Sequence, residues 1–178
     1  MRRQKISLCL ISVAAAIAMT TTGAFAFGET ATAVLKSASG SAAGMVTFTE
    51  GSAGVLLKFD IKGLPPGPHA VHIYETGKCE GDFASAGGIY NPLGAKHGFL
   101  AEEGPMAGDL PNIYAAADGS VIAEILSPAL SLSANAEEGL FDDDGAAVVI
   151  LEKADDYETE PDGGSGLRLA CGVVSLKK

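Results

Sequence analysis

Short apolar segments that alternate with polar residues are the feature that most constrains this fold. The clearest is residues 55–64, VLLKFDIKGL, where Val55, Leu57, Phe59 and Ile61 alternate with mainly polar residues. Successive side chains of a β-strand point to opposite faces. The pattern therefore predicts a strand with one buried face and one exposed face.

Similar segments recur along the chain and end at glycine-rich turns. The sequence predicts strands within 31–40, 45–54, 69–75, 146–152 and 167–176, and a hairpin over 113–126 that turns at Asp118-Gly119. A short helical turn is expected around 133–139. About eight short strands predict an all-β fold, an eight-stranded Greek-key β-barrel or sandwich.

Two long connections interrupt the predicted strands. One runs from about Thr76 to Asn112 and is rich in glycine and proline, and the other is the acidic segment 153–166. Long loops on a rigid β-scaffold commonly carry the functional residues. These two loops are therefore where we expect a site.

The first 26 residues have the pattern of a secretory signal peptide. Basic residues in 2–5 precede an apolar run over 6–19, and Ala24-Phe25-Ala26 fits a cleavage site. The run is short for a transmembrane anchor, and no later stretch is long and apolar enough to span a bilayer. We therefore expect a leader, 1–26, and one domain, 27–178, in a periplasmic or secreted protein.

The charge of the chain limits its partners. The precursor has a net charge of −10, and removing the three basic residues of the leader leaves −13. Such an acidic protein is a poor ligand for nucleic acid or an anionic membrane. We expect an unidentified protein or small-molecule partner, and a monomer or a homodimer.

Export also bears on the cysteines. Cleavage would remove Cys9 and leave Cys79 and Cys171. In an oxidising compartment two cysteines most simply form one disulfide.

Five blocks of sequence resemble the copper/zinc superoxide dismutase family. They are GLPPGPHAVHIYETGKC, SAGGIYNPLGAKHG, MAGDLPNIYAAADGS, LFDDDGAAVVILEKADDY and GGSGLRLACGVV, and they occur in order from about residue 31 to 174. The resemblance implies the family's eight-stranded Greek-key barrel. It also implies a Cys79–Cys171 disulfide, which agrees with the cysteine count.

The resemblance implies a metal site that has lost most of its ligands. The family holds copper with four histidines, and zinc with three histidines and an aspartate, one histidine being shared. Of those seven positions, His72 keeps a copper ligand, while His97 and Asp109 keep zinc ligands. The four replaced ligand positions are Tyr74, Ile89, Met106 and Leu151. Copper and zinc are implied by the family, but this ligand set is incomplete.

The substituted residues favour loss of the metals over a changed metal. Isoleucine and leucine cannot coordinate an ion and would add apolar surface to the core. Tyr74 or Met106 could still serve a remodelled metal site, because tyrosinate binds ferric iron and a thioether binds Cu(I). We therefore predict no cofactor and no dismutase activity, and a binding or structural role. The alternatives are a dismutase with a remodelled site and a copper- or haem-handling protein.

Three further residues take expected roles from the resemblance. Asp155 matches the carboxylate that links a copper histidine to a zinc histidine, so a buried His72–Asp155–His97 hydrogen-bond chain is expected. Arg168 matches the arginine that guides superoxide to copper, and here we expect it to pair with a carboxylate or a passing anion. Asp109 is expected either to cap loop N–H groups or to pair with His97.

Overall fold

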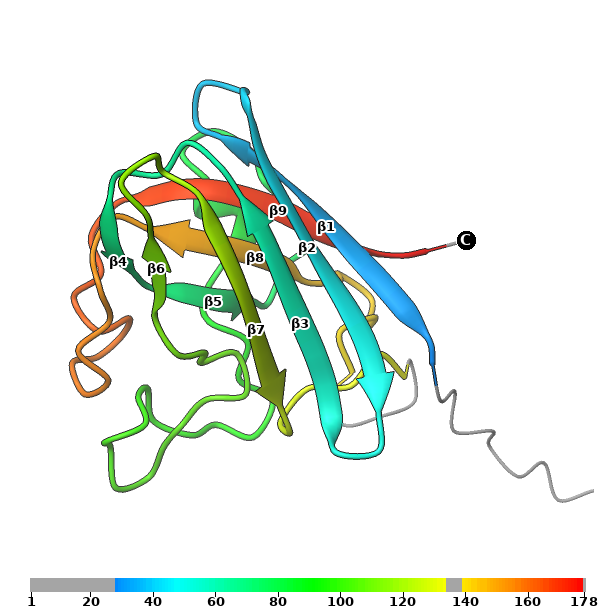
Figure 1. Cartoon of the computed structure of the whole chain (residues 1–178). Coiled ribbons are helices and arrows are strands. Elements are labelled where there is room, and N and C mark those ends of the chain that lie inside the picture. Colours follow the sequence, from blue (N-terminus) through cyan, green and yellow to red (C-terminus); the bar gives the residue numbers. More distant parts are fainter. Residues whose placement is uncertain (1–27, 134–138, 178) are drawn as a thin grey trace, which may run out of the picture.

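Seven strands form one antiparallel curled sheet in the computed structural model of the chain, which describes residues 28–133 and 139–177. Figure 1 shows strands β7, β3, β2 and β1 in front and β9, β8 and β5 crossing behind them. The order along the sheet is β5-β8-β9-β1-β2-β3-β7, and β4 and β6 form a separate pair. The bounds are β1 (Thr30–Ser37), β2 (Ala42–Gly51), β3 (Gly54–Ile61), β4 (Gly67–His69), β5 (Val71–Tyr74), β6 (Ile113–Ala115), β7 (Val121–Ser127), β8 (Ala147–Leu151) and β9 (Arg168–Leu176).

The predicted all-β fold is confirmed, and helix is confined to one 3-10 turn, η1 (Ala84–Ala86), within the described ranges. The predicted leader and the central residues of the turn expected around 133–139 lie outside these ranges. The described residues contain no helix that is long and apolar enough to cross a membrane.

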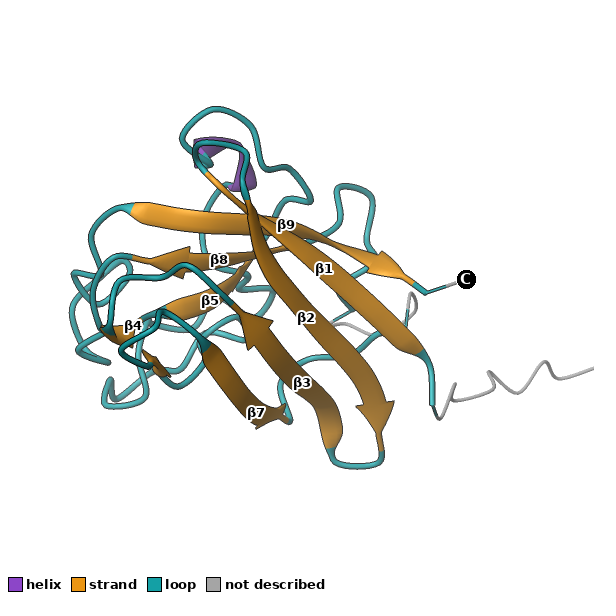
Figure 2. Ribbon diagram, turned by 45° about the horizontal axis from the view of Figure 1, so that its top comes forward, coloured by secondary structure: helices purple, strands orange, loops and turns teal. Residues whose placement is uncertain are grey.

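The main core fills the inside of the curl. The alternation predicted for 55–61 is confirmed, because Val55, Leu57, Phe59 and Ile61 are all buried there. Strands β5 and β8 differ from β3 because every one of their residues is buried. Their inner face joins the main core and their outer face is covered by the long loops, which Figure 2 shows as irregular teal segments.

The strand predicted over 69–75 crosses between the two sheets. It divides at Ala70 into β4, which pairs with β6, and β5, which pairs with β8. At the break, the Ala70 N–H donates to the carbonyl of Lys153, and the Ala70 carbonyl accepts from the Leu151 N–H. This division gives nine strands in the described part of the chain, where about eight were expected.

The hairpin predicted over 113–126 is wrong as a strand pairing. The turn itself forms, because the N–H groups of Ala116 and Gly119 bond within 116–120. Strand β6 then pairs with β4, whereas β7 pairs with β3. A strong Asp-Gly turn therefore reversed the chain but did not determine which strands pair.

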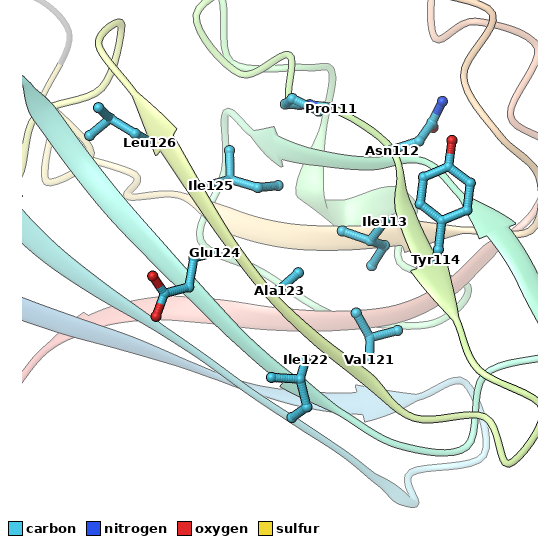
Figure 3. Close-up of a pocket in the computed structure, with 10 residues that line it drawn as sticks. All are labelled: Pro111, Asn112, Ile113, Tyr114, Val121, Ile122, Ala123, Glu124, Ile125 and Leu126. Carbon is cyan, nitrogen blue, oxygen red and sulfur yellow. The ribbon is translucent and has the colours of Figure 1, made fainter.

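Between β6 and β7 the surface is hollowed. Figure 3 shows this opening, lined by residues 111–114 and by β7 residues 121–126. Tyr114, Ile122 and Leu126 are exposed there, at 71, 79 and 54%. The separation of the two strands follows from their membership of different sheets.

The predicted disulfide is present. Cys79 and Cys171 are joined, with their Cα atoms 5.7 Å apart, and they tie the start of the first long loop to β9. The bond fixes that loop against the outer face of the sheet, where the candidate site lies.

Candidate functional site

The site lies behind β5 and β8, on the face opposite the main core. Because side chains alternate along a strand, Val71 and Ile73 join the main core while His72 and Tyr74 point to the loop side. The two long loops cover these side chains. The strand therefore delivers a histidine and a tyrosine into a space enclosed by loop residues.

One part of this space is apolar, and we call it the loop-side cluster. Its buried members are Ala70, Tyr74, Phe83, Ala86, Ile89, Ala147, Val149, Leu151 and Cys171, with Cys79 and Met106 packed against them. All four positions at which the sequence lacks an expected ligand lie in this cluster. Tyr74 and Ile89 also form a β-bridge, so these two positions are direct neighbours.

The adjoining part is polar, and we call it the His–Asp ring: His72, His97, Asp109 and Asp155, all buried. His97 Nδ1 lies 2.8 Å from Asp109 Oδ1, and its Nε2 lies 3.1 Å from Asp155 Oδ1. His72 spans the same two carboxylates at longer range, with Nδ1 3.6 Å from Asp109 Oδ1 and Nε2 3.5 Å from Asp155 Oδ2. Two imidazoles thus bridge two carboxylates.

His97 is held as a cation. Carboxylates only accept hydrogen bonds, so both ring nitrogens of His97 must donate, which requires the imidazolium form. Burial opposes that charge, but Asp109 and Asp155 outweigh it and raise the pKa of His97. The charge-assisted bonds hold the two loops together at this point.

His72 differs from His97 although both face the same carboxylates. Burial lowers the pKa of His72 to about 4, despite the opposing effects of Asp155 and Asp109. Both of its ring nitrogens, and Asp155 Oδ2, have no hydrogen-bond partner among the described residues. The expected His72–Asp155–His97 chain is therefore hydrogen-bonded only between Asp155 and His97.

The backbone holds the two carboxylates in place. Asp109 Oδ2 accepts from the N–H groups of Gly98 and Met106, at 2.8 and 2.9 Å. Asp109 thus fills both of the roles that the sequence left open, pairing with His97 and capping a loop. Asp155 Oδ1 accepts from the Tyr157 N–H at 2.6 Å as well as from His97.

Asn112 and Tyr157, which the sequence did not single out as site residues, hold the loop around Asp155 in place by hydrogen bonds. The Asn112 side chain donates to the Asp155 carbonyl and accepts from the Asp155 N–H. The Tyr157 hydroxyl accepts from the Asn112 N–H at 2.8 Å. Their positions inside the motifs AGDLPN and EKADDY are the only sequence signal for these contacts.

Within residues 28–133 and 139–177, Arg168 has no carboxylate partner. Its guanidinium carbon lies 4.4 Å from the ring centre of Tyr74, and it donates to the carbonyls of Phe83 and Gly87. A cation over an aromatic face is attracted to its electrons. Burial raises the pKa of Tyr74, even though Arg168 acts in the opposite direction. Arg168 thus fixes residues 83–87 over a neutral tyrosine.

The family model for copper/zinc superoxide dismutase matches residues 42–174. The chain belongs to this family. The superoxide dismutase [Cu-Zn] of Caulobacter vibrioides is 49% identical over 147 residues, which are 81% of this chain and 84% of that protein. The superoxide dismutase-like protein YojM of Bacillus subtilis is 42% identical over 138 residues, 76% and 70% of the two chains.

A crystal structure from the same family supports the fold. The SOD-like protein from Bacillus subtilis superposes with a TM-score of 0.78 at 41% identity, over 80% of this chain and 96% of that one. The overall fold described above therefore matches a solved architecture. Family membership settles the fold, whereas chemistry depends on the residues at the site.

The residues present do not fit the family's copper and zinc. Tyr74, Ile89, Met106 and Leu151 lie together in an apolar cluster, and two of these side chains have no donor atom. In the His–Asp ring, His97 Nδ1 and Asp109 Oδ1 are already hydrogen-bonded to each other. A structural zinc normally takes four protein ligands, and this set supplies two at the family's zinc positions. No reaction step can therefore be assigned to the family's metals.

Proposed function

We propose that this chain is an exported superoxide dismutase-like protein that lacks copper-dependent dismutase activity and has a binding or structural role. One observation carries the proposal: the four positions expected to supply metal ligands lie together in the loop-side cluster, where Tyr74, Ile89 and Leu151 are buried and Met106 packs against them partly buried. Dismutation needs a metal that cycles between two oxidation states, and such a metal needs several correctly held ligands. Aliphatic carbon cannot supply them.

Export is supported by the amino-terminal pattern and the disulfide. Cysteines of cytosolic proteins are usually kept reduced, whereas Cys79 and Cys171 are joined. Cell fractionation of a producing strain tests this part of the proposal. The protein is expected in the periplasm or medium, shortened by about the length of the leader.

The loss of copper chemistry is tested by loading and turnover. We expect the purified chain, supplied with copper, to retain less than about a tenth of an equivalent after dialysis against a chelator, and not to accelerate superoxide decay. A full copper equivalent, with turnover beyond that of the free ion, would refute the proposal.

A restoration experiment provides the matched positive control. The combined variant Tyr74→His, Ile89→His, Met106→His and Leu151→His replaces each lost ligand. We expect this variant to bind metal where the parent chain does not. If it folds and still binds none, these four residues do not occupy the ligand positions of the family.

A further inference from the structure

Strand β7 lies at one end of the seven-stranded sheet and is open along one side. It pairs with β3 in an unbroken register along its whole length. In an antiparallel pair, alternate residues direct both of their backbone groups away from the partner strand. Within residues 28–133 and 139–177, the backbone of 122–126 has no hydrogen-bond partner other than β3. Alternate N–H and C=O groups of β7 therefore face outward without a protein partner.

This open edge lacks the usual protection against a further strand. Natural edge strands carry prolines, bulges, several charges or a covering loop. Strand β7 has no proline and no bulge, and its one charged residue, Glu124, pairs with Lys58 of β3 at 2.8 Å. Both side chains are more than half exposed, so this ion pair is weak. The strand is therefore a template for pairing with another chain.

A groove follows the open edge. Its volume of about 500 Å³ lies within the range of about 300–1,000 Å³ that is typical of ligand sites. Ile113 and Ile125 line it and pack on the main core, whereas Ile122 and Leu126 are exposed beside it. Residues 111–114 stand on the side opposite β7, as Figure 3 shows. A single extended chain suits this space better than the edge of a second sheet.

We propose that β7 binds an extended segment of a partner protein, which joins the sheet as a further strand in this groove. On the outer face of β7, the exposed Ile122 and Leu126 flank Glu124. Cross-strand neighbours stabilise a sheet when apolar side chains face each other and opposite charges meet. The segment that fits therefore has a basic residue between two aliphatic ones on its outer face, with apolar residues between them that point into the groove.

A second copy of the chain fits this edge less well. Symmetric pairing of two β7 strands about Glu124 would place like charges directly opposite each other, which is destabilising. Each copy is also acidic, with a net charge of −10 before the leader is removed, so two copies repel. A segment with a basic residue at its centre meets neither obstacle.

This inference goes beyond the proposed function. None of the residues that line the groove belongs to the loop-side cluster or to the His–Asp ring. Failure to bind an extended segment would remove only the present inference. Copper-dependent turnover of superoxide would remove only the proposed function.

Binding is tested with the mature chain and a capped synthetic probe of sequence Ser-Ile-Val-Lys-Val-Ile-Ser. We expect one probe per chain and saturation below about 1 mM in a calorimetric titration. Amide NMR signals should shift within 111–114 and 121–126, and hydrogen exchange should slow at alternate residues of β7. A lack of saturation at this concentration, or shifts confined to other strands, would refute the proposal.

Modified probes test how the segment is held. Two probes carry N-methyl groups on alternate residues, and the methylated set of one is shifted by one residue from that of the other. Because only alternate N–H groups of the probe face β7, one set should weaken binding by at least about tenfold and the other by less than about twofold. Equal effects would mean that backbone pairing with β7 does not hold the probe, and would overturn the inference.

The charge of the partner is tested separately. Replacing the central lysine of the probe with glutamate should weaken binding about fivefold, because the like charge of Glu124 would then lie opposite. Unchanged affinity would contradict the basic character proposed for the segment.

Two lysine variants of the protein locate the site. Leu126→Lys places a charge at the groove, whereas Val34→Lys places the same charge on β1, and the two native residues are similarly exposed, at 54 and 59%. Leu126→Lys should weaken binding at least about tenfold and Val34→Lys less than about twofold. Equal losses would indicate general attraction of the probe to an acidic surface and refute the proposal. Folding is checked by circular dichroism, and the NMR map of the wild-type chain decides the result if Leu126→Lys does not fold.

Sedimentation of the chain without probe tests the competing occupant. We expect no association that depends on protein concentration and slows hydrogen exchange in β7. Such association would assign this edge to a second copy and overturn the inference.

Discussion

The loop-side cluster and the His–Asp ring are neighbours behind β5 and β8, yet they have opposite chemistry. In the cluster, mainly apolar side chains occupy the positions at which the resemblance to the family predicts ligands. In the ring, two histidines and two aspartates lie together, and backbone N–H groups hold the carboxylates. The difference teaches that the two regions contribute to stability in different ways. The cluster contributes by apolar burial, whereas the carboxylates of the ring fasten the loops by hydrogen bonds.

Removing a charge from the ring should have the largest effect. Asp109→Ala would leave the buried His97 imidazolium with one partner and free the N–H groups of Gly98 and Met106. We expect a loss of about 4 kcal/mol in the free energy of unfolding, measured by urea titration. The exposed Glu158 provides the control, and Glu158→Ala should change stability by less than about 0.5 kcal/mol. An equally small effect of Asp109→Ala would show that the ring is not a structural element.

Truncating the cluster should have the next largest effect. Leu151 is fully buried, and Leu151→Ala should cost about 3 kcal/mol through lost burial and a new cavity. Leu167 is 69% exposed, so Leu167→Ala serves as the matched control and should cost little. Equal losses for the two variants would contradict the view that the cluster is true core.

Acid should destabilise the ring through His72. Its pKa is about 4 in the folded chain and 6.5 as its usual value, so the unfolded state takes up a proton between these values and the folded state does not. Stability therefore falls as the pH decreases through this window, by about 2 kcal/mol between pH 7 and pH 5. His97 affects the free energy of unfolding in the opposite sense, because its pKa is raised. Its stabilising contribution is fully present below pH 6.5, so it does not add to the loss of stability between pH 6.5 and pH 4.

The His72→Gln variant isolates this effect. Urea titrations at pH 7 and pH 5 should show a difference in the wild type that is about 2 kcal/mol larger than in the variant. The same pH dependence in both proteins would assign the acid sensitivity to other groups.

The smallest effect is expected at the boundary of the cluster. Arg168→Lys keeps the charge but loses the planar group that contacts Tyr74, Phe83 and Gly87. We expect a loss of about 1 kcal/mol, measured by thermal unfolding, and no change in superoxide decay. A change in superoxide decay would return Arg168 to the guiding role that it has in the family.

Much of the fold could be predicted from local pattern. The alternation in β3 predicted its buried face, and the cysteine count predicted the disulfide. The pairing of β6 with β4 could not be predicted in this way, because the Asp118-Gly119 turn determines only a local reversal of the chain. Strand partners depend on contacts between residues far apart in the sequence.

The site was predictable in composition but not in arrangement. The resemblance predicts that four ligand positions are replaced, and that His72, His97 and Asp109 persist. It did not indicate that His97 would bond both carboxylates while His72 bonds neither. The two histidines differ only by the tenths of an ångström that separate a hydrogen bond from a longer contact, and residue spacing carries no information at that scale.

The disulfide has a consequence for the response of the chain to proteolysis. Both long loops lie almost entirely between Cys79 and Cys171, whose sulfur atoms close a covalent circle in the chain. A protease that nicks either loop once inside this circle leaves two fragments that remain linked. The nicked molecule would run as one species on a gel without reductant and separate into two pieces with it.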